Sequence, residues 1–112
     1  MLKSDEILLG HLFDAANRAA GKVVGKTREE FYADDTLHLA VTHLIQIVGE
    51  ASTKISKEFQ QQHPELPWRE MTGMRHKIVH DYFEVNLRIV WEVATVDLLE
   101  LIKLLDKIVP NP

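Results

Sequence analysis

The sequence has no cysteine, which excludes disulfide bonds and thiolate metal sites from this chain. It also has no apolar run long enough to span a membrane, because charged residues interrupt even the hydrophobic C-terminal stretch. No basic and apolar leader opens the chain. We therefore expect a soluble cytoplasmic protein without a cofactor.

Positive charge is also in short supply, since 13 lysines and arginines are outnumbered by 17 acidic residues, for a net charge of −4. Proteins that bind nucleic acid along a broad surface are usually basic, because phosphate neutralisation dominates that affinity. The charge balance argues against such a surface, and we expect no DNA binding. A focused site with a few cations remains open, as does a partner that supplies basic charge.

Strand-like alternation, internal repeats and low-complexity segments are absent, and nearly every segment follows the helical period. The length of 112 residues fits a single domain covering residues 1–112. Hydrophobic residues make up 46% of the chain, which is enough for a core. The sequence predicts an all-α fold, an up-and-down bundle of four main helices plus a short one.

Capping residues predict where the first helices begin and end. The first helix starts near Ser4 and ends in the glycine-containing stretch at residues 21–25. Thr27 and Glu30 have the spacing of a capping box, so a short helix over Phe31 is expected next.

The third helix shows the strongest periodic pattern and begins at Asp34 or Asp35. Its apolar stripe is Leu37, Val41, Leu44, Val48, Ala51, Ile55 and Phe59. Two prolines at residues 63–67 end it, and Pro67 suits the first turn of a fourth helix. The expected apolar residues of that fourth helix are Trp68, Met71, Met74 and Ile78.

A long last helix is predicted from about Leu87 to Lys107, with Asn86 as its cap and Pro110 after its end. Its apolar residues cover more than one face: Ile89, Val90, Val93, Ala94, Leu98, Leu101, Ile102, Leu104 and Leu105. A surface helix needs one buried stripe, so this helix is either central or shared with a second subunit.

Six histidines are candidate site residues. Four of them stand singly, and packing, capping or exposure accounts for them best: His11, His38, His43 and His63. His76 and His80 are four residues apart on the predicted fourth helix, so they could be two ligands of one metal ion. The nearby Asp81 would point elsewhere on a helix, so no third ligand accompanies them and we expect no metal site.

Arg75 and His80 form the most reactive combination in the chain. Five residues on a helix separate them by about 7.5 Å along the axis, and the arginine stem can span the angular offset. A guanidinium donates two parallel hydrogen bonds to a phosphate, and an imidazole takes or gives a proton near neutral pH. The pair has the minimal parts for metal-free RNA cleavage, in which the 2′-hydroxyl attacks the adjacent phosphate.

A single histidine cannot easily act as both base and acid in one in-line step. Two copies of the chain related by a twofold axis would supply two histidines, and the doubly apolar last helix gives an independent reason to expect that dimer. The motif by itself also has a purely structural interpretation, because short polar clusters occur at helix ends and structural ion pairs imitate sites.

Several blocks of the chain resemble, in order, the HepT-like branch of the HEPN superfamily (higher eukaryotes and prokaryotes nucleotide-binding domains). That branch carries an arginine, a polar residue, three further residues, a histidine, one residue and a tyrosine. These positions are filled here by Arg75, His76, His80 and Tyr82. Matching blocks also occur at residues 47–51, 67–68, 73–75, 86–91 and 97–101. The resemblance runs from about Thr27 to Ile108, and the first helix matches only loosely.

The resemblance implies a HEPN-like fold and a homodimeric ribonuclease toxin, with paired motifs lining a cleft at the dimer interface. Arg75 and His80 would then be catalytic, His76 would assist them, and Glu50 is a candidate partner for Arg75. The family's usual partner is a minimal nucleotidyltransferase antitoxin encoded beside the toxin. The resemblance implies that it transfers AMP to Tyr82, where a bulky anion would block the cleft and repel RNA.

A metal-independent ribonuclease toxin is therefore the main hypothesis. One alternative is a non-catalytic module that binds a nucleotide or a nucleotidyltransferase through the same face. Another is a purely structural helical dimer. RNA cleavage separates the first hypothesis from the other two, and partner-dependent or ATP-dependent binding without cleavage marks the second.

Overall fold

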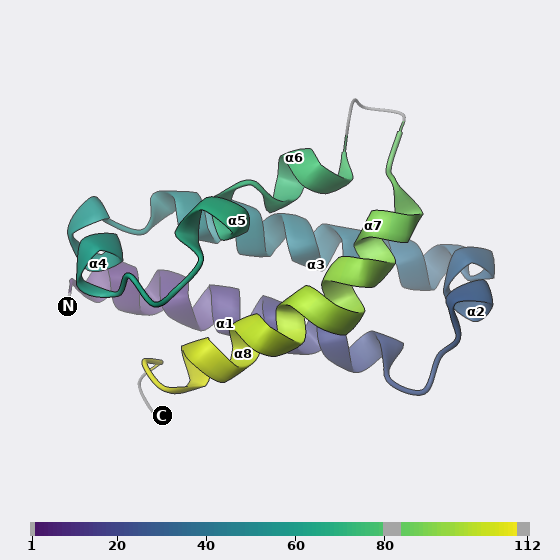
Figure 1. The fold of residues 1–112 in the computed structure, drawn as a ribbon, viewed down its shortest axis with the longest axis horizontal. Helices are drawn as coiled ribbons and strands as arrows, with labels where there is room; N and C mark the ends of the chain where they lie inside the picture. Colours follow the sequence, from purple (N-terminus) through teal and green to yellow (C-terminus); the bar gives the residue numbers. More distant parts are fainter. Residues whose placement is uncertain (1, 80–83, 110–112) are drawn as a thin grey trace.

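Two long antiparallel helices, α1 (Lys3–Val23) and α3 (Asp35–Lys54), form one layer of the computed structural model (Figure 1). The structure describes residues 2–79 and 84–109. Small side chains on the buried face of α1, among them Ala15, Ala16 and Ala19, let α3 pack close against it. From α3, the residues Val41, Ile45 and Val48 fill the core. 

The short helix α2 (Arg28–Ala33) begins with the predicted capping box. The Glu30 amide donates to Thr27 Oγ1 over 3.1 Å, and the Thr27 amide donates to Glu30 Oε1 over 2.9 Å. This helix buries Phe31, whose ring centroid lies 5.2 Å from that of Trp91 on the last helix. The capping box therefore starts the helix that carries Phe31 into the core.

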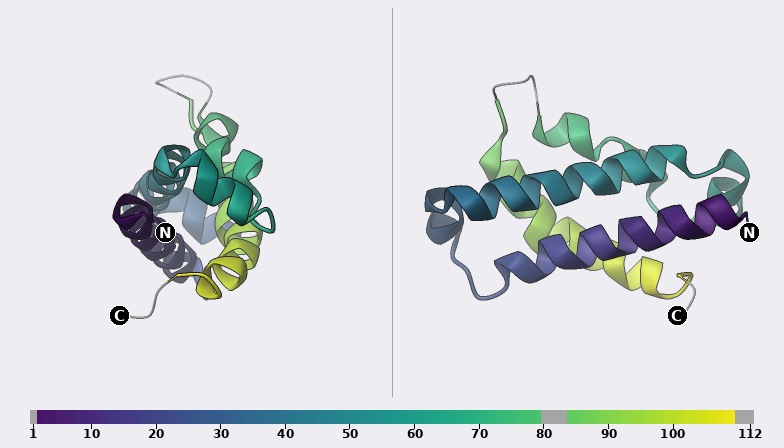
Figure 2. Two further views of the ribbon diagram at one scale, coloured as in Figure 1. Left: turned by 90° about the vertical axis from the view of Figure 1, so that its left-hand side faces the viewer. Right: turned by 180° about the vertical axis from the view of Figure 1, so that it is seen from behind.

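The second layer contains α5 (Trp68–Thr72), α6 (Met74–Ile78) and the long last helix. The last helix runs diagonally across α1 and α3 (Figure 2). That last helix consists of α7 (Leu87–Glu92), a π-helical turn η1 (Val93–Asp97) and α8 (Leu98–Asp106). It buries one face against the first layer: Val90, Val93, Ala94, Leu98, Leu101 and Leu105. The predicted long helix is confirmed, and within the described part of the chain no helix has the length and apolar character to cross a membrane.

The prediction of one continuous third helix up to Phe59 is wrong. α3 ends at Lys54, Ile55 is extended, and Phe59 lies on a separate helix, α4 (Lys57–Gln62). Ser56 caps α4 by accepting a hydrogen bond from the Phe59 amide over 3.1 Å. The buried carboxylate of Asp5 accepts hydrogen bonds from the Ser56 amide and hydroxyl, at 2.9 and 2.7 Å. This contact with α1 holds Ser56 in the capping position, so α3 ends at Lys54 although Ile55 and Phe59 are both buried.

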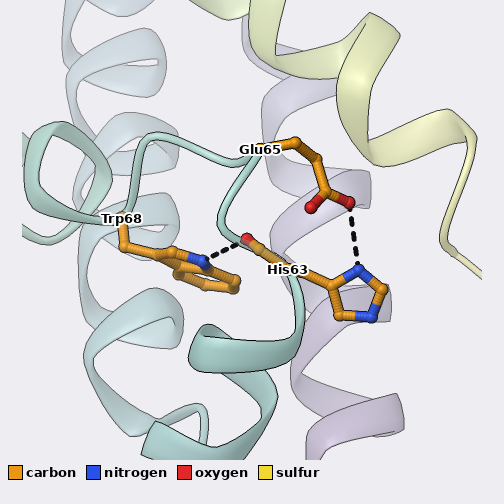
Figure 3. A network of polar contacts seen from close by, with 3 residues as sticks. All are labelled: His63, Glu65 and Trp68. Atoms are coloured by element: carbon orange, nitrogen blue, oxygen red, sulfur yellow. Dashed lines mark hydrogen bonds and ion pairs between the residues drawn. The ribbon is translucent and has the colours of Figure 1, made fainter.

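The linker between α4 and α5 is folded by three side chains (Figure 3). The Trp68 indole donates to the His63 carbonyl over 2.8 Å, and Glu65 Oε2 lies 3.1 Å from His63 Nδ1. The Glu65 carboxyl has a pKa below its ordinary value, first because its own backbone amide donates to it and second because of the His63 side chain. Trp68 also meets Phe59 edge-on. His63 thus has the structural role predicted for it, and the linker sets where α5 begins.

The predicted fourth helix is broken into α5 and α6 at Gly73, and it ends at Ile78. Beyond Ile78 the backbone of Val79 is extended and forms an isolated antiparallel bridge with Val85. That bridge is the one β feature of the described residues, so the all-α class is confirmed. The helix count differs from the predicted four plus one, because tertiary contacts divide two of the expected helices.

Candidate active site

The three consecutive residues Arg75, His76 and Lys77 are exposed on the short helix α6. Buried residues on both sides, Met74 and Ile78, anchor this helix in the core. Residues 71–80 contain no aspartate or glutamate, so the exposed turn is locally cationic in an acidic chain. The turn is a candidate for the focused site with a few cations, which the acidic net charge of the chain does not exclude.

Gly49 of α3 sets how closely α6 approaches the first layer. A Cβ added to Gly49 would lie 3.4 Å from the backbone nitrogen of Arg75, 3.5 Å from the Met71 carbonyl oxygen and 3.8 Å from the Met74 Cβ. Any side chain larger than a methyl group would therefore displace the first turn of α6. The glycine in the block at residues 47–51 thus determines the position of Arg75.

Gly73 forms the junction between α5 and α6. Its amide donates to the Arg69 carbonyl over 3.1 Å, and its carbonyl accepts from the Lys77 amide over 3.0 Å. An added Cβ would lie 3.1 Å from the Arg69 carbonyl oxygen, which is tighter than an ordinary contact. The absence of a side chain lets one helix end and the next begin without a connecting loop.

The chain leaves α6 at Val79 and returns beside it at Val85. The Asn86 amide donates to the Ile78 carbonyl over 2.9 Å, and the Asn86 side chain caps α7 by accepting from the Ile89 amide over 3.2 Å. These contacts hold the two described ends of the motif segment together. Asn86 is confirmed as the cap of the last helix.

His80 and Tyr82, the predicted catalytic histidine and the predicted AMP acceptor, lie outside the described residues. Their roles stay predictions. Arg75 and His76 lie on α6, which ends at Ile78. How His80 is placed relative to these two residues stays a prediction. Among the described residues, no group of three or more His, Asp and Glu side chains is placed to hold a metal.

Lys77 and Asp97 form an ion pair that the sequence did not predict. Lys77 Nζ lies 3.3 Å from Asp97 Oδ2, and both side chains are about half exposed. Asp97 belongs to the π-helical turn η1, whose wider winding shifts it around the helix axis relative to an uninterrupted α-helix. The pair joins the motif helix to the last helix, and the only sequence signal for it was the matching block that begins at Asp97.

A hollow of about 480 Å³ opens between the motif helix and α8. Gly73, Met74 and Leu101 contribute to its lining, and so do the paired Lys77 and Asp97. It is large enough for a side chain or a small ligand. Of the exposed residues Arg75, His76 and Lys77, the hollow is lined by Lys77.

The two predicted supporting residues occupy different surroundings. His76 is exposed between Arg75 and Lys77. Glu50 is exposed on α3 and lines a small hollow of about 150 Å³ between α1 and α3, together with His11 and Lys54. Within the described residues no hydrogen bond or ion pair joins Glu50 to Arg75, and the supporting role of Glu50 stays a prediction.

The described half of the site can bind an anion. In the part of the chain that the structure covers, Arg75 has no ion-pair partner, so its guanidinium is available for two parallel hydrogen bonds to a phosphate. Lys77, two residues further on, is a second cation, but Asp97 balances its charge through their ion pair. A guanidinium that has no ion-pair partner among the described residues, on an anchored helix, suits the recognition of a phosphodiester.

Comparison with known proteins shows the family to which the chain is similar. Residues 12–108 match the family model described as "Ribonuclease HepT-like". A protein of Caldanaerobacter subterraneus subsp. tengcongensis named "Putative RNase" is 36% identical over 102 residues, which is 91% of each chain. A Thermococcus cleftensis protein named "Probable ribonuclease HepT" is 43% identical over 70 residues, covering 62% of this chain and 64% of that protein. A "Putative RNase" of Methanocaldococcus jannaschii is 37% identical over 83 residues, covering 74% and 69%. No solved structure matches the chain.

Proposed function

The chain belongs to the HepT-like ribonuclease family, and from this premise we propose that it is a cytoplasmic toxin that cleaves RNA without a metal ion. The observation that carries the proposal is the exposed turn Arg75–His76–Lys77, which buried neighbours hold in place and in which Arg75 has no ion-pair partner among the described residues. Such a turn attracts a phosphodiester to one point of an otherwise acidic protein.

In the proposed reaction, Arg75 holds the scissile phosphate through two hydrogen bonds and stabilises the charge that develops on its oxygens. The 2′-hydroxyl of the RNA attacks this phosphate, and His80 accepts the hydroxyl proton. The 5′-oxygen of the next nucleotide leaves with a proton from a second histidine. The products are a 2′,3′-cyclic phosphate and a 5′-hydroxyl end.

That second histidine is the reason to propose a homodimer. A twofold pair places the same motif twice at one cleft, so that one His80 acts as base and the other as acid. His76 assists the two catalytic residues, and Glu50 supports Arg75. Both assignments follow the family motif and the matching block around Gly49.

The proposed chemistry predicts that cleavage requires the ribose 2′-hydroxyl and survives metal removal. We expect the purified protein to cut RNA in EDTA at an unchanged rate, and to leave a substrate with a single 2′-deoxynucleotide at the cut site intact. Mass spectrometry of the products should find the cyclic phosphate. Cleavage of the 2′-deoxy substrate or of DNA would contradict the mechanism. Binding of RNA or nucleotide with no cleavage would instead favour the non-catalytic module.

We further propose that a nucleotidyltransferase antitoxin silences this toxin by transferring AMP from ATP to the phenol of Tyr82, with release of pyrophosphate. The added group carries a negative charge and the volume of a nucleotide, so it would repel and exclude RNA phosphate beside Arg75. The acidic net charge of the chain suits an enzyme that acts under such control better than a constitutive RNA binder.

Co-expression with the nucleotidyltransferase is expected to add the mass of one AMP to the peptide that contains Tyr82. The matched control is Tyr32, the other tyrosine of the chain, which lies exposed on α2. Tyr32→Phe should keep the adduct and Tyr82→Phe should lose it. An adduct that persists in Tyr82→Phe, or an intact mass without AMP, would reject this regulation.

A further inference from the structure

A second hollow, of about 500 Å³, lies beside the linker that joins α4 to α5, and we call it the linker hollow. Aromatic, apolar, amide and cationic side chains line it together, among them Lys57, Gln60, Gln61, Leu66, Trp68 and Arg69. None of these residues takes part in the proposed reaction. The linker hollow therefore offers a mixed surface whose purpose the cleavage chemistry does not explain.

Trp68 is fixed in this hollow before any ligand binds. Its indole N–H donates to the His63 carbonyl over 2.8 Å (Figure 3), and its ring contacts that of Phe59. The side chain is nevertheless partly exposed and forms part of the lining. Nucleobases stack on such aromatic side chains, because every base has a flat π-face. A ring that is already held in place loses little freedom when a base binds to it.

An amide group accompanies the aromatic ring. Gln61 is exposed on α4 and lines the hollow. The amide nitrogen of its neighbour Gln60 donates to the Ile55 carbonyl over 3.1 Å, which leaves the Gln60 side-chain oxygen as an acceptor. A glutamine amide both donates and accepts hydrogen bonds, so these two side chains can bond to the edge of a stacked base.

The charge of the linker hollow suits a polyanion. Lys57 and Arg69 are exposed, and neither forms an ion pair within the part of the chain that the structure describes. Glu70 is the one carboxylate among the described residues that line the hollow. The lining is therefore net positive in a chain whose net charge is −4, which concentrates an anionic strand at this point.

The linker hollow adjoins the hollow between α6 and α8. Pro67, Arg69 and Glu70 line both of them, and the second hollow extends to Lys77 in the exposed turn of the motif. Six residues separate Arg69 from Arg75, and a chain of that length spans at most about 22 Å. At a rise of about 3.4 Å per nucleotide, a strand of about six nucleotides covers this distance.

We propose that the linker hollow is a binding subsite for single-stranded RNA, in which a base stacks on Trp68 while Lys57 and Arg69 hold its phosphates. The inference rests on the proposed function, since it concerns the substrate of the same reaction at a distance from the cut. It explains how an acidic protein holds a long RNA without a broad basic surface. An acidic peptide would match the two cations but would make no use of the stacking surface.

Removal of the two cations tests the subsite. The ligand is a single-stranded 2′-O-methyl RNA, which lacks the attacking hydroxyl, and its affinity is measured by fluorescence anisotropy over a range of salt concentrations. Lys57→Ala with Arg69→Ala should weaken binding by about tenfold and make the salt slope shallower by about 1.4, at about 0.7 for each lost phosphate contact. The matched control, Arg18→Ala with Lys22→Ala on α1, should leave both unchanged. Glu70→Gln should bind more tightly.

Trp68 itself reports the stacking. The chain has two tryptophans, and Trp91 packs against Phe31 on the other side of the fold's second layer. The oligonucleotide should quench the fluorescence of the native protein and of Trp91→Phe, but not that of Trp68→Phe. Circular dichroism confirms that each variant is folded.

Native affinity and salt slope in the variant without the two cations would overturn the proposal, as would quenching that survives in Trp68→Phe. Poly-glutamate that displaces the oligonucleotide and quenches Trp68 equally well would assign the hollow to an acidic peptide, and would overturn the RNA subsite as well.

Cleavage of a long RNA and of a dinucleotide separates this inference from the proposed function. A native protein that cleaves RNA, with a double variant that cleaves both substrates at native rates, would overturn the subsite and leave the ribonuclease assignment standing. A native protein that binds the oligonucleotide through Lys57 and Arg69 but cleaves no RNA would do the reverse. If both hold, the variant should lose about tenfold in kcat/KM on the long RNA and nothing on the dinucleotide, which leaves the subsite empty.

Discussion

Replacing Arg75 with lysine is expected to lower the rate of RNA cleavage by about 100-fold or more while leaving the fold intact. Lysine keeps the positive charge but offers a single ammonium in place of the planar fork that grips two phosphate oxygens. The Arg75 side chain is exposed and its backbone is held by buried neighbours, so the change removes little packing. A loss of activity at constant stability would assign Arg75 to the reaction.

The matched control is Arg18→Lys, the same change at an exposed arginine of α1 whose partner is Asp14. It should leave cleavage unchanged.

His80→Ala is expected to reduce cleavage by about 10²–10⁴-fold, the usual contribution of a positioned acid or base. Single-turnover rates at saturating RNA, together with urea unfolding of each variant, measure these effects. Native rates in both Arg75→Lys and His80→Ala would refute the assigned chemistry.

Replacing Gly49 with isoleucine is expected to destabilise the protein by about 1–3 kcal/mol and to abolish RNA cleavage. The branched side chain would meet the backbone nitrogen of Arg75 and the carbonyl of Met71, so α6 must shift away from α3. Because Arg75 sits on the displaced turn, its guanidinium would no longer be held at the phosphate. A shift of about 1 Å at a catalytic group can cost about 100-fold in rate.

Two further variants separate the clash from a general effect of losing glycine. Gly49→Ala places its methyl group at ordinary contact distances and should keep both stability and activity. Gly10→Ile puts the same isoleucine on α1, where an added Cβ meets nothing within 4 Å, and should be tolerated. Urea unfolding followed by circular dichroism gives the stabilities. If Gly49→Ile unfolds and cleaves like the native protein, the close approach of α3 and α6 has no functional role.

Local patterns in the sequence predicted much of the fold. The capping box of Thr27 and Glu30, the cap at Asn86 and the break at residues 63–67 all appear in the structure. Each depends on groups within a few residues of one another, so spacing alone is informative. The apolar stripes likewise identified most of the core, since a helical period shows which face is buried.

The missed boundaries depend on contacts between distant segments. α3 ends early because Asp5, which lies 51 residues before Ser56, accepts hydrogen bonds from the Ser56 amide and hydroxyl. α6 ends at Ile78 because the chain returns at Val85 and Asn86 and bonds to it. Neither partner is visible to a local helical pattern. The sequence did not predict the π-helical turn, and therefore did not predict the Lys77–Asp97 pair. A single π-helical turn adds one residue to the helix, and the spacing of the apolar residues changes too little to reveal it.

The sequence by itself determined the helical class, the family resemblance and the identity of the motif residues from Arg75 to Tyr82. Composition, periodicity and short-range spacing contain that information. The tertiary structure decided that Arg75, His76 and Lys77 project from a separate short helix, seated on Gly49 and tied to Asp97. It also placed Lys77 and Asp97 together in the lining of a hollow between α6 and α8. Those arrangements depend on how helices pack against each other, and packing is settled only when residues far apart in the chain are brought together.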